Sequence, residues 1–541
     1  MKYILVFLLL AAQNIFAQQT TKEDKQMTDD LRATVNFLAD DRLEGRRTGM
    51  PGEKIAYTYI ENKFRSAGLK PFKPGTGYIQ AFEVNEGREE GKENSFVLNG
   101  RPMELNKDYF PYPYSGNIRQ FQFTEENTDV EYYDITPVLT ENENNPHFDL
   151  TENIISYTKK AAARGIKLVI VRHTPAPNDK FSFDAKDKNP SLAIPVIYLF
   201  PSDRVSPDKV VPTGKSVSAL TVVISEKKRV GHNVIGFINN SAPNTIILGA
   251  HYDHLGYGED HNSLYTGKPL MIHNGADDNA SGTAALIALG KWLKNSRFKK
   301  YNYILMAFSG EELGLYGSKY FTEHPGLDLK KVNYMINMDM IGRLNESTHG
   351  LTIGGFGTSP SWGQLISKTD SYFKINTDSS GTGPSDHTSF YRKEIPVLFF
   401  FTGSHSDYHK PGDDAEKINY PGEIQIIHYI QNIISKTDKM AKLTFTKTRE
   451  VAMGKSSFKV SLGIMPDYTY SGSGVMVDGV SDSRPAQKAG IKTGDVLIQL
   501  GEHKFTDVQS YMNVLNMFNK GESTKVKLKR GNEEMTLPIT F

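Results

Sequence analysis

The stretch Asn274-Gly275-Ala276-Asp277-Asp278-Asn279-Ala280-Ser281-Gly282 decides how the rest of the chain is interpreted. Two adjacent carboxylates precede a run of small residues that suits the start of a closely packed helix. Neighbouring side chains point in different directions, so one aspartate can face a site while the other braces the turn. The positive end of a helix dipole favours anionic groups there. Taken alone, an exposed acidic turn explains the stretch equally well.

Four further motifs place histidines and carboxylates just beyond apolar runs that read as buried strands, or at the head of a helix. They are Gly249-Ala250-His251-Tyr252-Asp253-His254, Gly310-Glu311-Glu312-Leu313-Gly314, Asn337-Met338-Asp339-Met340-Ile341-Gly342 and Asp407-Tyr408-His409-Lys410-Pro411. In open α/β sheets, ligands gather at such positions. Two imidazoles and several carboxylates that converge there suit a pair of hydrolytic zinc ions.

The residue types within these motifs suggest a division of labour. Asp253 can brace the ring of His251 through its second nitrogen, as metal-bound imidazoles usually require. Glu311 and Glu312 are costly at the mouth of a buried strand unless a cation neutralises them. One of the two carboxylates can then be a ligand and the other a general base. Taken singly, each motif also has a structural explanation, such as a capped turn or a surface loop.

Composition limits the classes of protein to which the chain can belong. A length of 541 residues predicts three or four structural units. A net charge of +1 provides no basic field, which argues against a nucleic-acid partner. The absence of cysteine excludes disulfides, thiolate zinc sites and cysteine nucleophiles.

The N-terminal residues 1–17 read as a cleaved signal peptide. Lys2 precedes an apolar core from Ile4 to Ala12, and cleavage is expected after Ala17. The apolar run is too short to span a membrane as a helix. We therefore expect a secreted or periplasmic protein without a membrane span; a buried N-terminal strand is the alternative.

Hydrophobic periodicity predicts an α/β fold with a mixed, mainly parallel sheet between layers of helices. Strands are expected at 245–248, 303–308, 332–338 and 396–401, and helices at 279–294, 312–321 and 423–440. Residues 18–107 form the N-terminal part of this unit, and residues 227–445 form its main part. Residues 108–226 read as an inserted β-rich lid, and residues 456–541 as a separate C-terminal domain.

The motif blocks resemble those of metallopeptidase family 28, the co-catalytic zinc aminopeptidases, and the resemblance is strong over about 230–440. It implies a zinc exopeptidase fold with two zinc ions per chain and peptide substrates. Carried onto this chain, it makes His251 and Asp339 ligands of one zinc, Glu312 and His409 ligands of the other, Asp277 the bridging ligand, Glu311 the general base, Asp253 the residue that orients His251, and Tyr408 a donor to the tetrahedral intermediate. It also implies a cis peptide bond between Asp277 and Asp278, and it makes Ser385-Asp386-His387 a lining of the pocket.

Two other segments resemble known modules. A helix that ends in Ala-Ala-Ala-Arg-Gly at 161–165, just before a Val/Ile strand, loosely resembles a protease-associated domain inserted in the peptidase. Ser461-Leu462-Gly463-Ile464 and the run 485–498 resemble a PDZ domain of the bacterial protease type. That resemblance implies a groove for a peptide C-terminus or an extended segment. The alternatives are an irregular α/β lid and a small domain that only stabilises the chain.

Several functions remain open at the level of sequence. An aminopeptidase is the main expectation, although the sequence does not identify which carboxylate would bind the α-amino group. Dipeptidase and carboxypeptidase activities fit the same site. A glutaminyl cyclase shares the fold but uses one zinc ion, and an ester or acid-sugar hydrolase could use the same metals. A peptide-binding protein with a PDZ groove and a vestigial peptidase core belongs to a different class.

Overall fold

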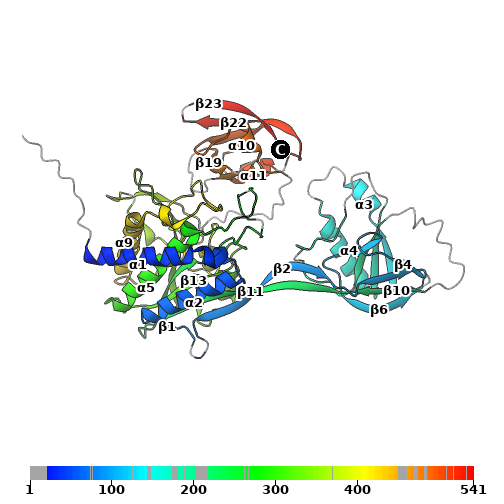
Figure 1. Ribbon diagram of the computed structural model, residues 1–541, viewed down its shortest axis with the longest axis horizontal. Helices are drawn as coiled ribbons and strands as arrows, with labels where there is room; N and C mark the ends of the chain where they lie inside the picture. The colour runs from blue at the N-terminus through cyan, green and yellow to red at the C-terminus, as the bar shows by residue number, and fades with distance from the viewer. Residues whose placement is uncertain are drawn as a thin grey trace, which may run out of the picture. The chain divides into compact units, whose positions relative to one another are not determined.

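The computed structural model describes residues 21–73, 75, 77–124, 127–142, 148–173, 181–187, 189–200, 217–260, 262–265, 267–367, 369–448, 460–466, 473–480, 484–506, 508–515, 517–531 and 533–541. The predicted signal peptide lies outside these residues. The chain divides into two compact units, residues 83–229 and the remainder (Figure 1). Among the described residues, no helix is both long and apolar enough to cross a membrane.

The larger unit is built on a nine-stranded mixed sheet, counted over the described residues. Its strands are β1 (Lys70–Pro71), β2 (Ile79–Glu90), β11 (Ile224–Ile238), β12 (Thr245–His251), β13 (Asn302–Phe308), β14 (Val332–Met338), β15 (Gly350–Gly354), β16 (Lys374–Thr377) and β17 (Val397–Phe401). The order is β1-β11-β13-β12-β14-β17-β15-β16, and β2 pairs with β11. The central strands β13, β12, β14 and β17 are parallel. Their carboxyl ends therefore meet at one edge of the sheet.

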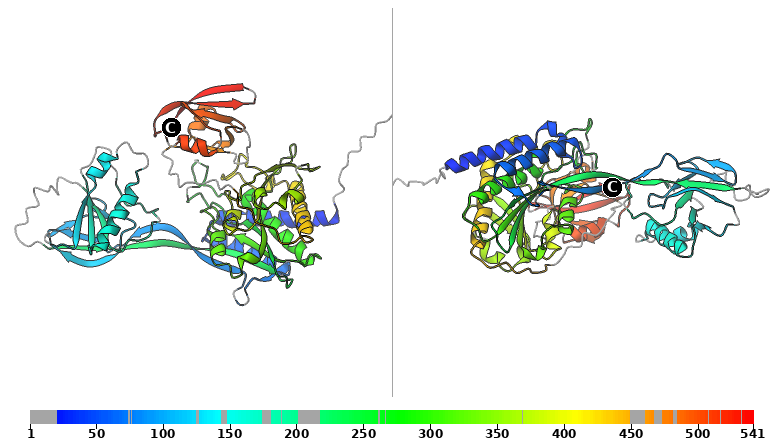
Figure 2. Two further views of the ribbon diagram at one scale, coloured as in Figure 1. Left: turned by 180° about the vertical axis from the view of Figure 1, so that it is seen from behind. Right: turned by 90° about the horizontal axis from the view of Figure 1, so that it is seen from below.

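Helices cover both faces of this sheet. They are α1 (Lys22–Leu38), α2 (Pro51–Ser66), α5 (Gly282–Asn295), α6 (Tyr316–Glu323), α7 (Trp362–Leu365), α8 (His387–Tyr391) and α9 (Tyr420–Thr437). Alternate residues of β12 face opposite sides. Ile246 and Leu248 share a core with residues of α1, α2, α5 and α9. Ile247 belongs to a second core with Phe321 of α6 and Phe390 of α8. Figure 2 shows two further views of the ribbon, in which helices lie on both sides of this sheet. A strand buried on both faces reads as a continuous apolar run, which is how the sequence identifies it.

The structure confirms the predicted fold class and most of the predicted central elements. Strand 332–338 has the predicted limits, and the closing helix lies at 420–437 instead of 423–440. Helix α6 begins at Tyr316 and not at Glu312, because Gly310, Gly314 and Leu315 all have positive φ. Residues 312–315 consequently form a turn, and Glu312 is free to face the edge of the sheet.

The smaller unit, residues 83–229, contains two four-stranded sheets. One has the order β4-β3-β10-β6, with β3 (Ser95–Leu98), β4 (Arg101–Met103), β6 (Ile118–Phe123) and β10 (Ser218–Val222). The other has the order β5-β9-β8-β7, with β5 (Tyr109–Pro111), β7 (Val130–Asp134), β8 (Leu168–Arg172) and β9 (Val196–Leu199), beside α3 (Thr136–Glu141) and α4 (Leu150–Ala163). The predicted range of 108–226 omits β3 and β4, which pair in the same sheet as β10.

The C-terminal residues form an antiparallel sheet of order β18-β19-β20-β22-β23, with β21 paired to β20. The elements are β18 (Ile464–Pro466), β19 (Val475–Val480), α10 (Pro485–Ala489), β20 (Val496–Leu500), β21 (His503–Lys504), α11 (Val508–Leu515), β22 (Ser523–Arg530) and β23 (Glu533–Thr540). Leu462, Val475 and Leu497 contribute to a separate apolar core. A core of its own is the mark of an independent domain.

Candidate metal centre

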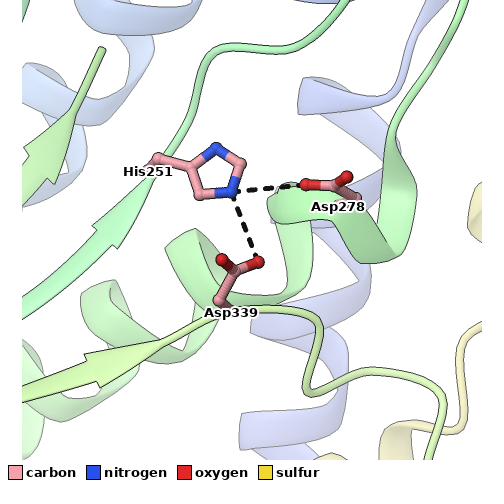
Figure 3. A group of neighbouring side chains, drawn as sticks. All are labelled: His251, Asp278 and Asp339. Atoms are coloured by element: carbon pink, nitrogen blue, oxygen red, sulfur yellow. Dashed lines mark hydrogen bonds and ion pairs between the residues drawn. The ribbon is translucent and has the colours of Figure 1, made fainter. Parts of the chain in front are cut away.

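One group of possible metal ligands joins the end of β12 to the residue that follows β14. The Nε2 atom of His251 lies 3.3 Å from Oδ1 of Asp278 and 3.3 Å from Oδ1 of Asp339 (Figure 3). All three residues are buried. Three ligand atoms that converge in this way fit one cation.

A second group uses the other oxygen of the same aspartate. The Nε2 atom of His409 lies 3.2 Å from Oδ2 of Asp278 and 3.3 Å from Oε2 of Glu312. The Nδ1 atom of His254 is 2.7 Å from Oε1 of Glu312 and 3.9 Å from Oδ2 of Asp278. Asp278 therefore stands between two groups of nitrogen and oxygen ligands. This arrangement is what a carboxylate that bridges two metal ions requires.

The predicted bridging residue, Asp277, is the wrong one of the adjacent pair. Its Oδ1 accepts hydrogen bonds from the backbone N–H of Gly342 at 2.7 Å and from the hydroxyl of Ser281 at 3.0 Å. Its Oδ2 lies 3.3 Å from Nε2 of His405, away from both groups. Asp277 thus braces the turn while Asp278 faces the histidines. The cis bond likewise joins Asp278 to Asn279 and not Asp277 to Asp278.

The segment that carries the two aspartates is η2 (Ala276–Ser281), which leads into α5. Asp278 and Asn279 depart from helical geometry there. The side chain of Asn279 donates to the carbonyl of Met338 and accepts from the N–H of Gly282. These bonds tie the start of α5 to the end of β14, and so hold Asp278 beside the strand that leads to Asp339.

Imidazoles and carboxylates within the centre compensate one another's charges. Burial opposes protonation of His251 and His409, but carboxylates outweigh it and hold the pKa of both rings well above its usual value. Burial also opposes ionisation of Glu312, but His409 and His254 keep its pKa at about 2. Metal ligands must be deprotonated, so a cation would have to replace the protons on these imidazoles.

Two of the three residues predicted to assist catalysis, Asp253 and Glu311, lie beside the first group. The Nδ1 atom of His251 is 3.2 Å from the backbone carbonyl of Asp253 and 3.8 Å from its carboxylate. The ring is thus braced by the main chain of Asp253 more closely than by its side chain. Burial raises the pKa of the Glu311 carboxyl well above its usual value, although the positive charge of His251 opposes the shift. A cation in the centre would act in the same direction as the charge of His251 and would lower the pKa of the Glu311 carboxyl.

Tyr408 precedes His409 and stacks on its ring, with centroids 3.9 Å apart. Burial raises the pKa of its phenol well above the usual value, and the nearby carboxylates of Asp278 and Glu312 add to the shift. The hydroxyl consequently stays protonated and can donate a hydrogen bond.

The Ser385-Asp386-His387 block is buried close to the centre. Burial raises the pKa of Asp386 to about 7, although the charge of His251 opposes the shift. The ring of His387 stacks on Phe399 with centroids 4.5 Å apart, and burial lowers its pKa to about 3. His387 is therefore neutral and apolar in its contacts. Neither residue belongs to the two groups of candidate ligands, and their role as a lining of the pocket stays a prediction.

His254 is the residue that sequence reasoning missed. It ends the motif that contains His251 and Asp253, but no role was predicted for it. The feature of the sequence that could have identified His254 is its position three residues after His251, in the loop that follows β12. Its contact with Glu312 joins that loop to the turn after β13.

Nitrogen and carboxylate ligands without thiolate suit zinc, and the donors of both groups fit such an ion. A parallel sheet with these ligands at its carboxyl edge defines an α/β protein of the zinc exopeptidase fold.

Comparison with known proteins identifies the domains. Residues 233–434 match the profile of peptidase family M28, and residues 452–540 match that of the PDZ domain. The chain therefore contains an M28 peptidase domain followed by a PDZ domain. The protease-associated character of the insert predicted at 108–226, the signal peptide and the peptide partner of the PDZ domain stay predictions.

Several curated relatives are named as aminopeptidases. The chain is 25% identical over 294 residues to leucine aminopeptidase 2 of Trichophyton equinum, a match that covers 50% of this chain and 54% of that protein. It is 27% identical over 277 residues to aminopeptidase YwaD of Bacillus subtilis, covering 48% and 55%. The chain thus spans about half the length of the curated relatives it matches. A zinc aminopeptidase structure from Bacillus subtilis aligns with a TM-score of 0.43 and 19% identity, over 78% of this chain and 96% of that one.

Proposed function

We propose that the protein is a zinc-dependent aminopeptidase that removes N-terminal residues from peptides at a centre of two zinc ions. One observation carries the proposal. The two oxygens of Asp278 are divided between His251 and His409, at 3.3 and 3.2 Å. Asp339 completes the first group of ligands, and Glu312 completes the second. A centre of one ion, as in a glutaminyl cyclase, would not account for the second of these two buried groups of ligand atoms.

The chain's own residues supply the remaining parts of a hydrolytic mechanism. Zinc, when bound, lowers the pKa of a water ligand and polarises a carbonyl group. Glu311 accepts a proton from the attacking water and returns it to the departing amine. Tyr408, protonated and beside His409, donates a hydrogen bond to the oxyanion that develops on the scissile carbonyl. The main-chain carbonyl of Asp253 holds His251 in the orientation needed for a ligand.

Removal of the general base tests the mechanism. In Glu311→Gln we expect turnover of an aminoacyl-anilide to fall by roughly 10²–10⁴-fold. Zinc content, measured by plasma emission spectroscopy, should stay at two ions per chain because Glu311 belongs to neither group of ligands. Glu323→Gln, an exposed glutamate at the end of α6, is the matched control and should retain full activity. Retained turnover in Glu311→Gln would remove this residue from the role of base.

A panel of peptides tests the direction of cleavage. One peptide is offered to the zinc-loaded enzyme unblocked, N-acetylated and C-amidated, with and without a chelator. An aminopeptidase must recognise the free α-amino group, so we expect acetylation to abolish hydrolysis and amidation to leave it intact. The chelator should stop all reactions. Hydrolysis of the acetylated peptide, or loss of hydrolysis on amidation, would contradict the proposal and favour carboxypeptidase action.

A further inference from the structure

The turn Leu43-Glu44-Gly45-Arg46-Arg47-Thr48 lies between α1 and α2, far in sequence from every candidate ligand. It belongs to η1 (Asp41–Arg46) and the residues that follow. Glu44, Gly45 and Arg46 all have positive φ, at 45°, 65° and 47°. Non-glycine residues in this region cost on the order of 1 kcal/mol each, and they persist only where their surroundings fix them. A Cβ at Gly45 would lie 2.6 Å from the carbonyl oxygen of His273, so the turn is packed directly on the loop before Asp278.

Arg46 is fully buried, and among the described residues its guanidinium donates to main-chain carbonyls. Its guanidinium donates to Tyr252 at 2.7 Å, to Asn274 at 2.6 Å, to Gly275 at 2.9 Å and to Leu38 at 2.5 Å. Tyr252 lies between His251 and Asp253. Asn274 and Gly275 lie just before Asp278. One side chain therefore joins the loop that carries His251 to the loop that carries Asp278.

Thr48 makes a second link of the same kind. Its hydroxyl donates to Oδ2 of Asp253 at 2.8 Å and accepts from the backbone N–H of Gly310 at 3.1 Å. Asp253 follows β12, and Gly310 directly precedes Glu311. The hydroxyl therefore joins the loop of His251 to the turn that bears Glu311 and Glu312.

The charge of Arg46 also fits this place. Burial lowers its pKa to about 10, while the nearby carboxylates of Asp278 and Asp253 oppose the shift, so the guanidinium is protonated at neutral pH. A buried cation is costly unless its donors are satisfied. Four carbonyl acceptors take up four of its five N–H donors, and a lysine of similar length could not reach all four because it carries a single nitrogen.

We propose that Arg46 and Thr48 are positioning residues of the metal centre. They fix the relative positions of three loops at the carboxyl edge of the sheet, namely those that carry His251, Asp278 and Glu312. The inference rests on the proposed zinc function but concerns a different segment of the chain. Neither residue touches a candidate ligand atom. Partners in this second layer typically change metal affinity by about 10–100-fold when they are removed.

Thr48 provides the sharper test because it has an isosteric and a conservative substitute. Thr48→Val keeps the shape of the side chain and removes the hydroxyl, while Thr48→Ser keeps the hydroxyl. The full metal-free chain is titrated with zinc in competition with a chromophoric chelator. We expect Thr48→Val to bind zinc about tenfold more weakly than the wild type, and Thr48→Ser to restore affinity to within about threefold. At saturating zinc, kcat for an aminoacyl-anilide should fall in Thr48→Val with little change in KM, because the turn before Glu311 loses its anchor.

Arg46→Lys tests the other link, with Arg42→Ala as its matched control. Arg42 lies in η1 just before the turn, is 71% exposed at its side chain and pairs with Asp40. We expect Arg46→Lys to weaken zinc binding by at least about tenfold and Arg42→Ala to leave it unchanged. If Arg46→Lys fails to fold, the two Thr48 variants decide the question alone.

The possible outcomes separate this inference from the proposed function. Zinc affinities of Thr48→Val and Arg46→Lys within twofold of the wild type would overturn the positioning role, and so would equal losses in Thr48→Val and Thr48→Ser. A wild-type chain that binds zinc but releases no amine from any peptide would overturn the proposed function while the affinity comparison still stands. A wild-type chain that binds no zinc would overturn both.

Discussion

Two buried aspartates, one in the peptidase domain and one in the PDZ domain, are neutralised in different ways. Asp495, just before β20, accepts two hydrogen bonds from the guanidinium of Arg530, both at 2.7 Å, and one from the N–H of Lys492 at 2.8 Å. Asp278 instead faces the imidazoles of His251 and His409. Both carboxylates are almost fully buried. The difference lies in the partner, because arginine keeps its proton while an imidazole can give its proton up to a cation that takes its place.

This difference separates a structural carboxylate from a ligand. A carboxylate paired with arginine is satisfied permanently, and a metal ion has no place to enter. A carboxylate paired with imidazoles can exchange their protons for a cation that both partners then bind. Burial and an acidic residue at the end of an element are common to the two sites. The chemistry of the counter-ion is what distinguishes them.

The largest expected effect comes from the adjacent pair at the metal centre. Asp278→Asn should weaken zinc binding by roughly a hundredfold or more and abolish turnover, because it removes the carboxylate between the two groups of ligands. Asp277→Asn should keep both zinc ions, since its Oδ1 accepts from Gly342 and Ser281 and an amide oxygen can still accept. Competition titration with zinc measures the first effect, and plasma emission spectroscopy counts the ions.

The reverse result would return the bridging role to Asp277. Loss of zinc in Asp277→Asn, with binding intact in Asp278→Asn, would show that the ligand set differs from the one described. Equal loss in both variants would show that the turn as a whole, and not one carboxylate, controls binding. Asp407→Asn is a suitable control, because Asp407 pairs with Arg343 and Lys417 and belongs to neither group of ligands.

The family resemblance points to four of the candidate ligands in the sequence, and the local pattern supports them. His251 ends a strand of the parallel sheet, Asp339 directly follows one, and Glu312 and His409 lie in the segments after two others, so apolar runs place all four near one edge. Asp278 differs because the choice between two neighbouring carboxylates depends on backbone geometry. Asp278 and Asn279 leave the helical conformation, and no periodicity in the sequence reports that departure.

The fold was predictable from the sequence where a strand is buried on both faces. β14 and the other central strands are buried on both faces and appear as continuous apolar runs. β11 runs for fifteen residues, is exposed at 225–228 and is largely buried from 231 to 238, so its limits were not predictable from an apolar run. The turn of Arg46 was visible as a motif. Its contacts with Tyr252 and Gly275 were not, because they join residues more than two hundred positions apart.

The smallest expected effect concerns Asp495, the aspartate of the comparison that is paired with arginine. Burial raises the pKa of Asp495, but the hydrogen bonds from Arg530 outweigh it and hold the pKa below the usual 3.8. A depressed folded pKa adds stability that is fully present above about pH 4 and is lost as the pH falls through the folded value. Asp495→Asn should therefore lower hydrogen-exchange protection of β22 by roughly tenfold at pH 7, and the gap to the wild type should narrow near pH 3.

This measurement is made on the full chain, by exchange of peptides that cover β20 and β22, with zinc present and absent. Zinc should leave the protection of these strands unchanged in both proteins, because Arg530 already neutralises Asp495. Lys527→Ala is the matched control on the same strand: its pair with Glu534 is about half exposed, so only a minor effect is expected. A gap that stays constant between pH 7 and pH 3 would mean that the charge of Asp495 does not stabilise the PDZ domain. The comparison of the two aspartates would then be supported only by the variants of Asp277 and Asp278.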